Sequence, residues 1–143
     1  MDKSDRRRIF IKLDEMIKYV EELNEILPGN EEYSKDLIRR RACEKTIEIA
    51  IESLIDVSAM IISSEKFGLP SSEEGIFDIL VDRNVLTREI SEKLKDMKGF
   101  RNVLIHRYAH VDDEIVYHNL SNYLDDFYIF KKAVELFLEN KNT

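Results

Sequence analysis

The stretch IEIAIESLIDVSAMII, residues 47–62, decides the fold, because it is hydrophobic on most faces of a helix. A helix of that kind is expected at the centre of a bundle, where neighbouring helices cover it on several sides. The stretch belongs to a longer helical pattern that runs from about Ser34 to Ser64. We therefore expect the other helices of the chain to pack around this one.

Helical periodicity also precedes this stretch. Apolar residues recur at spacings of three and four from Ile9 to Leu27, and the sequence Pro28-Gly29-Asn30 then ends a first helix. The chain has four glycines and two prolines, and it shows no strand-like alternation of any length. These features favour helices from end to end.

Capping signals divide the rest of the chain. Ser71 and Glu74 form a capping box that predicts a short helix through about Val81. Thr87 predicts the start of a further helix, and Asp112 suits the start of the last one. The fold class is therefore all-α: an antiparallel up-and-down bundle of four long helices plus one short helix.

Composition bounds the kind of protein. A chain of 143 residues is long enough for one domain, so we predict a single domain over residues 1–143. Cys43 is the single cysteine, and the chain opens without an export signal, so a cytoplasmic location is expected. The apolar runs are far shorter than the ~20 residues that span a bilayer, so no membrane is expected. The net charge of −7 argues against a protein that coats nucleic acid, although it leaves a localised phosphate site open.

The segment FRNVLIHRYAH, residues 100–110, gathers the side chains that carry chemistry, including two of the three histidines. Residues four apart share a helix face, so Asn102 and His106 are neighbours, whereas Arg101 lies about 140° around the axis from His106. Arg101 falls on the apolar side and is expected to point partly toward the core. The two side chains therefore meet only if the helix ends or distorts near His106, or if a second chain completes the site.

Two interpretations of this segment need no metal. In the first, Arg101 and Tyr108 join helices through hydrogen bonds, and His106 is a satisfied, half-buried side chain. In the second, the residues perform phosphate chemistry. The Arg101 guanidinium then stabilises a crowded phosphorane, His106 moves protons, and Asn102 orients one of the reacting groups.

A third interpretation uses a metal ion held by His106 and His110, which are four residues apart. Arg107 would then sit among the ligands, and no third ligand has a fixed spacing to this pair. We therefore predict no metal. In that metal interpretation, the ligands besides His106 and His110 would be Asp112, Asp113 or His118.

The arrangement Arg101-Asn102-x-x-x-His106-x-Tyr108 resembles the R-x-x-x-x-H-x-Y signature of the HEPN superfamily, and specifically of HepT-type toxins from prokaryotic toxin-antitoxin operons. The segment RRRACEKTIEIAIESLIDVSAMII, residues 39–62, resembles the long second helix of that family. The Gly68-Leu69-Pro70 loop followed by a short helix also fits. The likeness covers about residues 5–138.

This resemblance implies a homodimer in which the motifs of two chains face each other across one cleft. It also implies a metal-independent endoribonuclease without a cofactor, the toxin of a type II/VII-like toxin-antitoxin system. In that reaction the 2′-hydroxyl of RNA attacks the adjacent phosphate. His106 would be the general base or acid, Arg101 would clamp the phosphate, and Asn102 would orient the reacting groups.

The resemblance further implies a regulatory role for Tyr108. An MntA-like nucleotidyltransferase antitoxin would transfer AMP to this tyrosine, placing a bulky anion where RNA phosphate must bind. Arg107, His110 and Tyr117 are candidate substrate-facing residues. The alternative function is a non-catalytic HEPN bundle that only binds the nucleotidyltransferase.

Overall fold

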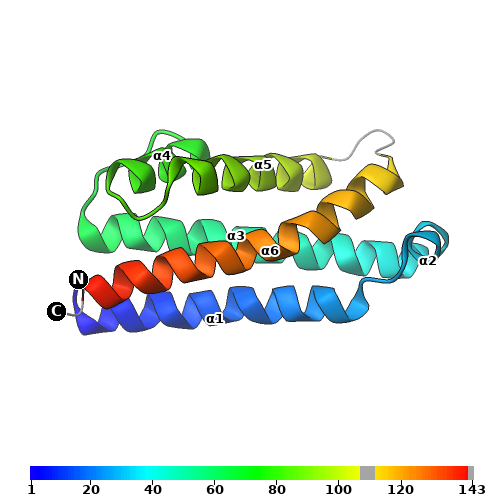
Figure 1. The fold of residues 1–143 in the computed structure, drawn as a ribbon, viewed down its shortest axis with the longest axis horizontal. Helices are drawn as coiled ribbons and strands as arrows, with labels where there is room; N and C mark the ends of the chain where they lie inside the picture. Colours follow the sequence, from blue (N-terminus) through cyan, green and yellow to red (C-terminus); the bar gives the residue numbers. More distant parts are fainter. Residues whose placement is uncertain (107–111, 142–143) are drawn as a thin grey trace.

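The computed structural model describes residues 1–106 and 112–141, and all regular secondary structure in this part of the chain is helical (Figure 1). The helices, in chain order, are α1 (Lys3–Ile26), α2 (Asn30–Lys35), α3 (Leu37–Glu65), α4 (Glu73–Asp82), α5 (Arg88–Ile105) and α6 (Asp113–Asn140).

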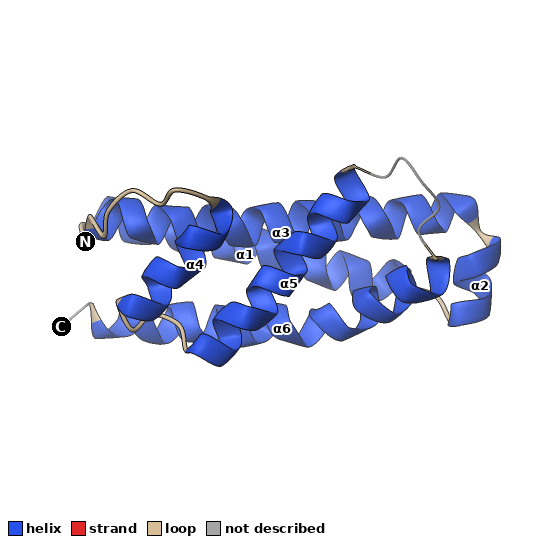
Figure 2. Ribbon diagram, turned by 90° about the horizontal axis from the view of Figure 1, so that it is seen from above, coloured by secondary structure: helices blue, strands red, loops and turns tan. Residues whose placement is uncertain are grey.

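The long helices form an antiparallel bundle, because the chain reverses its direction between α1 and α3, between α3 and α5, and again between α5 and α6 (Figure 1). The two termini consequently lie at one end of the bundle, and α2 lies at the other. Viewed from above, α5 crosses α3 obliquely, while α4 covers the adjoining end of the bundle (Figure 2). The predicted all-α, up-and-down architecture is confirmed.

The predicted central helix is also confirmed, because α3 packs against every other helix that the structure describes. Most of its apolar side chains between residues 47 and 62 are buried, while Ile49, Ala59 and Met60 are partly exposed. Burial of apolar surface stabilises the folded state by about 25 cal/mol per Å². The buried side chains of α3 therefore contribute to the stability of the core. Its innermost residues are Ile47, Ile51, Leu54, Val57 and Ile61.

Helix α2 is a second short helix that the sequence pattern did not predict. The periodicity indicated one helix from about Ser34, whereas α2 ends at Lys35 and α3 begins at Leu37. Asp36 separates them in an extended conformation, and its carboxylate accepts a hydrogen bond from the backbone N–H of Arg39 at 3.0 Å. Capping by Asp36 satisfies the first turn of α3 and so breaks an otherwise continuous pattern.

The predicted caps of α5 and α6 are confirmed, since Thr87 accepts a hydrogen bond from the N–H of Ile90 and Asp112 accepts one from the N–H of Glu114. The predicted cap of α4 was wrong by one residue. Ser72, not Ser71, accepts the hydrogen bond from the N–H of Gly75 at 3.0 Å. Only Ser72 lies three residues before that N–H, so only its hydroxyl can cap the first turn.

Candidate active site

The motif lies at the carboxyl end of α5. Arg101 and Asn102 belong to its last turns, Ile105 is its last residue, and His106 follows as the C-cap with φ −98° and ψ 37°. The helix therefore ends at the histidine, which is one of the two possibilities that the helical spacing left open.

Arg101 is buried, as its position on the apolar side of the helix predicted, and only 9% of its surface is exposed. Its Nη2 donates to Oε1 of Glu73, in the first turn of α4, at 2.6 Å. Oδ1 of Asn102 accepts from both Nε and Nη2, at 3.3 and 2.9 Å. A buried guanidinium needs such partners, because an uncompensated charge in the protein interior is costly.

His106 lies on the exposed side of the same helix end. Its backbone N–H donates to the carbonyl oxygen of Asn102 at 3.0 Å, which closes the last turn of α5. The structure thus brings the side chains of Arg101 and Asn102 together, and His106 is exposed at the end of the same helix.

Three sequence-predicted residues, Arg107, Tyr108 and His110, lie outside the residues that the structure describes. Their assigned roles remain predictions. Among residues 1–106 and 112–141, no group of three His, Cys, Asp or Glu side chains is arranged to hold a metal ion. The partner proposed for His106 in the metal interpretation, His110, is not among them.

The first turns of α6, which follow the motif in the chain, contact the end of the bundle that carries α2. The hydroxyl of Tyr117 donates to the carbonyl oxygen of Pro28 at 2.7 Å, and its ring lies 5.2 Å from that of Tyr33. Arg40 donates to the carbonyl oxygen of Ser34 at 2.6 Å and forms an ion pair with Asp113 at 3.7 Å. Tyr117 therefore has a structural role, and its expected place at the substrate is not supported.

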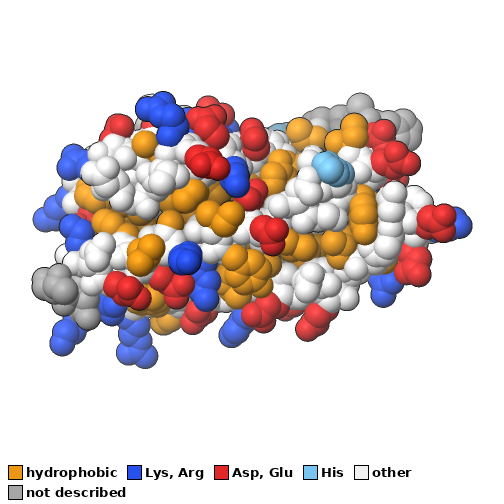
Figure 3. Space-filling model, viewed as in Figure 1, with side chains coloured by type: hydrophobic (Ala, Val, Ile, Leu, Met, Phe, Trp, Pro, Cys, Tyr) orange, Lys and Arg blue, Asp and Glu red, His pale blue; other side chains and the backbone are white. Residues whose placement is uncertain are grey.

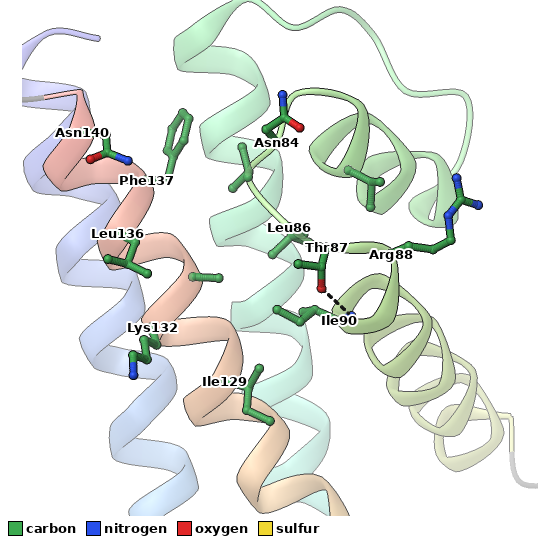
Figure 4. A pocket seen from close by; sticks show the side chains of 13 residues that line it. Asn84, Leu86, Thr87, Arg88, Ile90, Ile129, Lys132, Leu136, Phe137 and Asn140 are labelled. Atoms are coloured by element: carbon green, nitrogen blue, oxygen red, sulfur yellow. Dashed lines mark hydrogen bonds between the residues drawn. The ribbon is translucent and has the colours of Figure 1, made fainter.

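A groove of about 650 Å³ lies at the other end of α5, between the loop that precedes it and the last turns of α6 (Figure 4). Its walls are mostly apolar, with Leu86 and Leu136 on opposite sides, and no acid or histidine lines it. The hydroxyl of Thr87 is engaged in capping α5. This groove therefore lacks the groups that acid-base chemistry requires, and the motif is the better candidate.

Sequence reasoning missed one residue of this site, Glu73. It lies 28 positions before Arg101 and contacts it only because α4 folds back against α5. Its sequence neighbours Ser72 and Glu74 mark a helix start, and acidic residues are common in a first helical turn. No spacing rule along the chain could have joined Glu73 to the motif.

The model of the family described as "Ribonuclease HepT-like" matches residues 16–134, which include α4, α5 and the motif at the carboxyl end of α5. The chain belongs to this family. The predicted HepT-type resemblance is therefore confirmed, and this HepT-like protein is a member of a family of ribonucleases.

Two relatives have descriptions that name an RNA. The chain is 25% identical over 127 residues to an mRNA nuclease HepT of Shewanella oneidensis. The aligned region covers 89% of this chain and 96% of the relative. The chain is also 22% identical over 108 residues to a tRNA nuclease HepT of Aphanizomenon flos-aquae. That aligned region covers 76% of this chain and 74% of the relative. The two names differ in the RNA, so they do not define a common substrate.

A solved structure has the same fold. It is the tri-AMPylated HEPN toxin of Shewanella oneidensis in complex with an MNT antitoxin, with a TM-score of 0.85 and 23% identity. The match covers 95% of this chain and 99% of that toxin. Within the described part of the present chain, no helix is long and apolar enough to cross a membrane.

Proposed function

We propose that this HepT-like protein is an endoribonuclease toxin that cleaves RNA without a metal ion or cofactor. The observation that carries the proposal is the end of α5. There a buried Arg101 guanidinium, held by Asn102, and an exposed His106 belong to the same helix end in a member of a ribonuclease family. These are the two functions that phosphodiester transesterification requires, a cationic clamp and a proton carrier.

The proposed reaction begins when His106 accepts the proton of an RNA 2′-hydroxyl. The 2′-oxygen then bonds to the adjacent phosphorus, and the bond from phosphorus to the 5′-oxygen breaks. The protonated His106 then gives its proton to the leaving 5′-oxygen, which yields a 2′,3′-cyclic phosphate and a 5′-hydroxyl. Arg101 stabilises the additional negative charge on the phosphorane, and Asn102 keeps the guanidinium in place.

A second copy of the chain would complete this site. His106 and Arg101 point to different sides of α5, so one chain presents them to different surroundings. The face that carries α5 and α6 gathers hydrophobic side chains along α6 (Figure 3). Ile115, Ile129 and Leu136 on α6 are all exposed, and their spacings of 14 and 7 residues place them on one stripe. We infer that this stripe forms a homodimer interface.

The protein partner is inferred to be a nucleotidyltransferase antitoxin. The Shewanella toxin of the same fold is tri-AMPylated and forms a complex with an MNT antitoxin. By analogy, the antitoxin of this chain would adenylylate Tyr108, which stands two residues after His106. The added phosphodiester would repel RNA phosphate and occupy the space beside the histidine. The proposed location of both proteins is the cytoplasm, in keeping with the single, buried free thiol of Cys43.

The decisive experiment expresses the wild type and His106→Ala without any partner and measures growth and the integrity of cellular RNA. Loss of general acid-base catalysis lowers rates by about 10²–10⁴-fold, so the variant should be nearly harmless. Equal growth and equally intact RNA would refute the nuclease proposal. That result would favour the alternative, a non-catalytic bundle that only binds the nucleotidyltransferase.

A further inference from the structure

We propose that Glu73 is a positioning residue for the ribonuclease reaction, because its carboxylate holds the Arg101 guanidinium so that the Nη1 end faces the scissile phosphate. The proposal rests on the proposed nuclease function and adds to it a residue that lies outside the R-x-x-x-x-H-x-Y motif. Glu73 belongs to α4, and no residue of that helix was expected at the site.

Arg101 has more hydrogen-bond donors than its two partners use. A guanidinium has five N–H groups in a fixed plane, on Nε, Nη1 and Nη2. Oδ1 of Asn102 accepts from Nε and Nη2 at 3.3 and 2.9 Å, and Oε1 of Glu73 accepts from Nη2 at 2.6 Å. Within the described part of the chain, no hydrogen bond involves Nη1. The two partners therefore engage Nε and Nη2 and leave the N–H groups of Nη1 for an anion.

Asn102 alone defines this orientation poorly. Its amide oxygen belongs to the residue next to Arg101, so both side chains could turn together. Glu73 supplies a contact from a different helix, and it is the shortest of the three. A charge-assisted bond of this kind is about twice as strong as a neutral one. Glu73 therefore ties the guanidinium to a fixed point outside α5.

Other contacts of α4 hold Glu73 in position. Ser72 caps α4 directly before Glu73. Two more ion pairs join α4 to α5 on the same side, between Glu74 and Lys98 at 3.5 Å and between Asp78 and Lys95 at 2.7 Å. These two pairs hold the helices together without contacting the motif. Glu74 is thus a matched control for Glu73, because it lies in the same helical turn and binds the same partner helix.

The first experiment measures cleavage of a fluorophore-quencher RNA of mixed sequence by purified full-length variants. Glu73→Ala removes a hydrogen bond to a charged group, so kcat should fall about 10–100-fold. Glu73→Gln keeps an oxygen that can accept from Nη2 and should retain most of the activity. Glu74→Ala should match the wild type in rate and in melting temperature. Glu73→Ala should melt at a lower temperature, because the buried Arg101 charge loses a partner, so the rates are compared at a temperature where every variant is folded. Full activity in Glu73→Ala, or equal losses in Glu73→Gln and Glu73→Ala, would overturn the proposal.

A second measurement is independent of ribonuclease activity. In ¹⁵N–¹H spectra, the Nη2 hydrogens of Arg101, assigned by their absence in Arg101→Lys, should be resolved in the wild type because the ion pair restricts their rotation. They should persist in Glu73→Gln and Glu74→Ala and broaden in Glu73→Ala. Identical signals in all four proteins would refute the positioning role. A wild type that cleaves no RNA would refute the proposed function alone, since the spectra would still decide the role of Glu73.

Discussion

The backbone N–H of His106 donates to the carbonyl oxygen of Asn102 at 3.0 Å, so the last hydrogen-bonded turn of α5 joins two residues of the motif. The same turn carries the side-chain contact of Asn102 with the buried Arg101. The position of the histidine therefore depends on where the helix ends, and the position of the arginine depends on how the helix packs. The predictions below separate these contributions.

Replacing Arg101 with lysine should abolish most of the RNA cleavage even though the positive charge is retained. The lysine ammonium lacks the planar guanidinium, which contacts Glu73 and Asn102 through Nε and Nη2 and still presents the donors of Nη1. Losing one transition-state donor lowers kcat about 10²–10³-fold. The rate of RNA cleavage measures the effect, and Arg39→Lys, at an exposed ion pair with Glu32, is the control. A fully active Arg101→Lys enzyme would show that charge alone suffices.

Tyr108 should gain mass when the protein is incubated with the proposed nucleotidyltransferase partner and ATP. Each transfer adds one AMP unit, and intact-mass spectrometry would resolve the additions. The additions should be absent from Tyr108→Phe, which lacks the acceptor hydroxyl, and should remain in the control Tyr117→Phe. An unchanged wild-type mass, or equal additions in Tyr108→Phe, would contradict the assignment.

The stripe on α6 should hold two chains together. Ile129 and Leu136 are 37% and 53% exposed, and an introduced glutamate at each would place charges in the proposed apolar interface. The double variant Ile129→Glu with Leu136→Glu should sediment as a monomer, whereas the wild type should sediment as a dimer. Ile38→Glu is a control at another exposed isoleucine, 83% accessible and outside the stripe. A double variant that remains dimeric would place the interface elsewhere.

Cys43 should react slowly with iodoacetamide while the protein is folded. Burial raises the pKa of the Cys43 thiol from 9.0 to about 11, so at pH 8 the folded protein has about 100-fold less thiolate than an exposed cysteine. Because the folded pKa lies above the unfolded one, the stability contributed by this group falls as pH rises from 9 to 11. Mass spectrometry after alkylation should show fast labelling only in urea sufficient to unfold the chain. Fast labelling without urea would show that Cys43 becomes accessible in the native state.

Much of the fold followed from local chemistry. The apolar stretch at residues 47–62 identified the central helix, since a helix without a polar face is stable only when others surround it. Thr87 and Asp112 marked helix starts because a side-chain oxygen must satisfy the first free N–H groups. The burial of Arg101 followed from the angle per residue of an α-helix, which places this residue on the apolar side of α5.

Other features depended on competition between similar local signals. Ser71 and Ser72 are adjacent and both can cap a helix, and the chain uses the second. Asp36 interrupts a periodic pattern that would otherwise continue into α2. In each case neighbouring residues offered nearly equal local signals, so the sequence pattern placed the helix boundary only to within a few residues.

The sequence by itself determined that this protein is a helical bundle with a ribonuclease-type motif at the end of one helix, because helix periodicity, capping and the motif spacing act over a few residues. Only the tertiary structure decided what holds Arg101. Glu73 and Arg101 are distant in sequence, and they form a 2.6 Å contact because α4 and α5 pack together. A contact between two helices depends on their relative position in space, which no local pattern specifies.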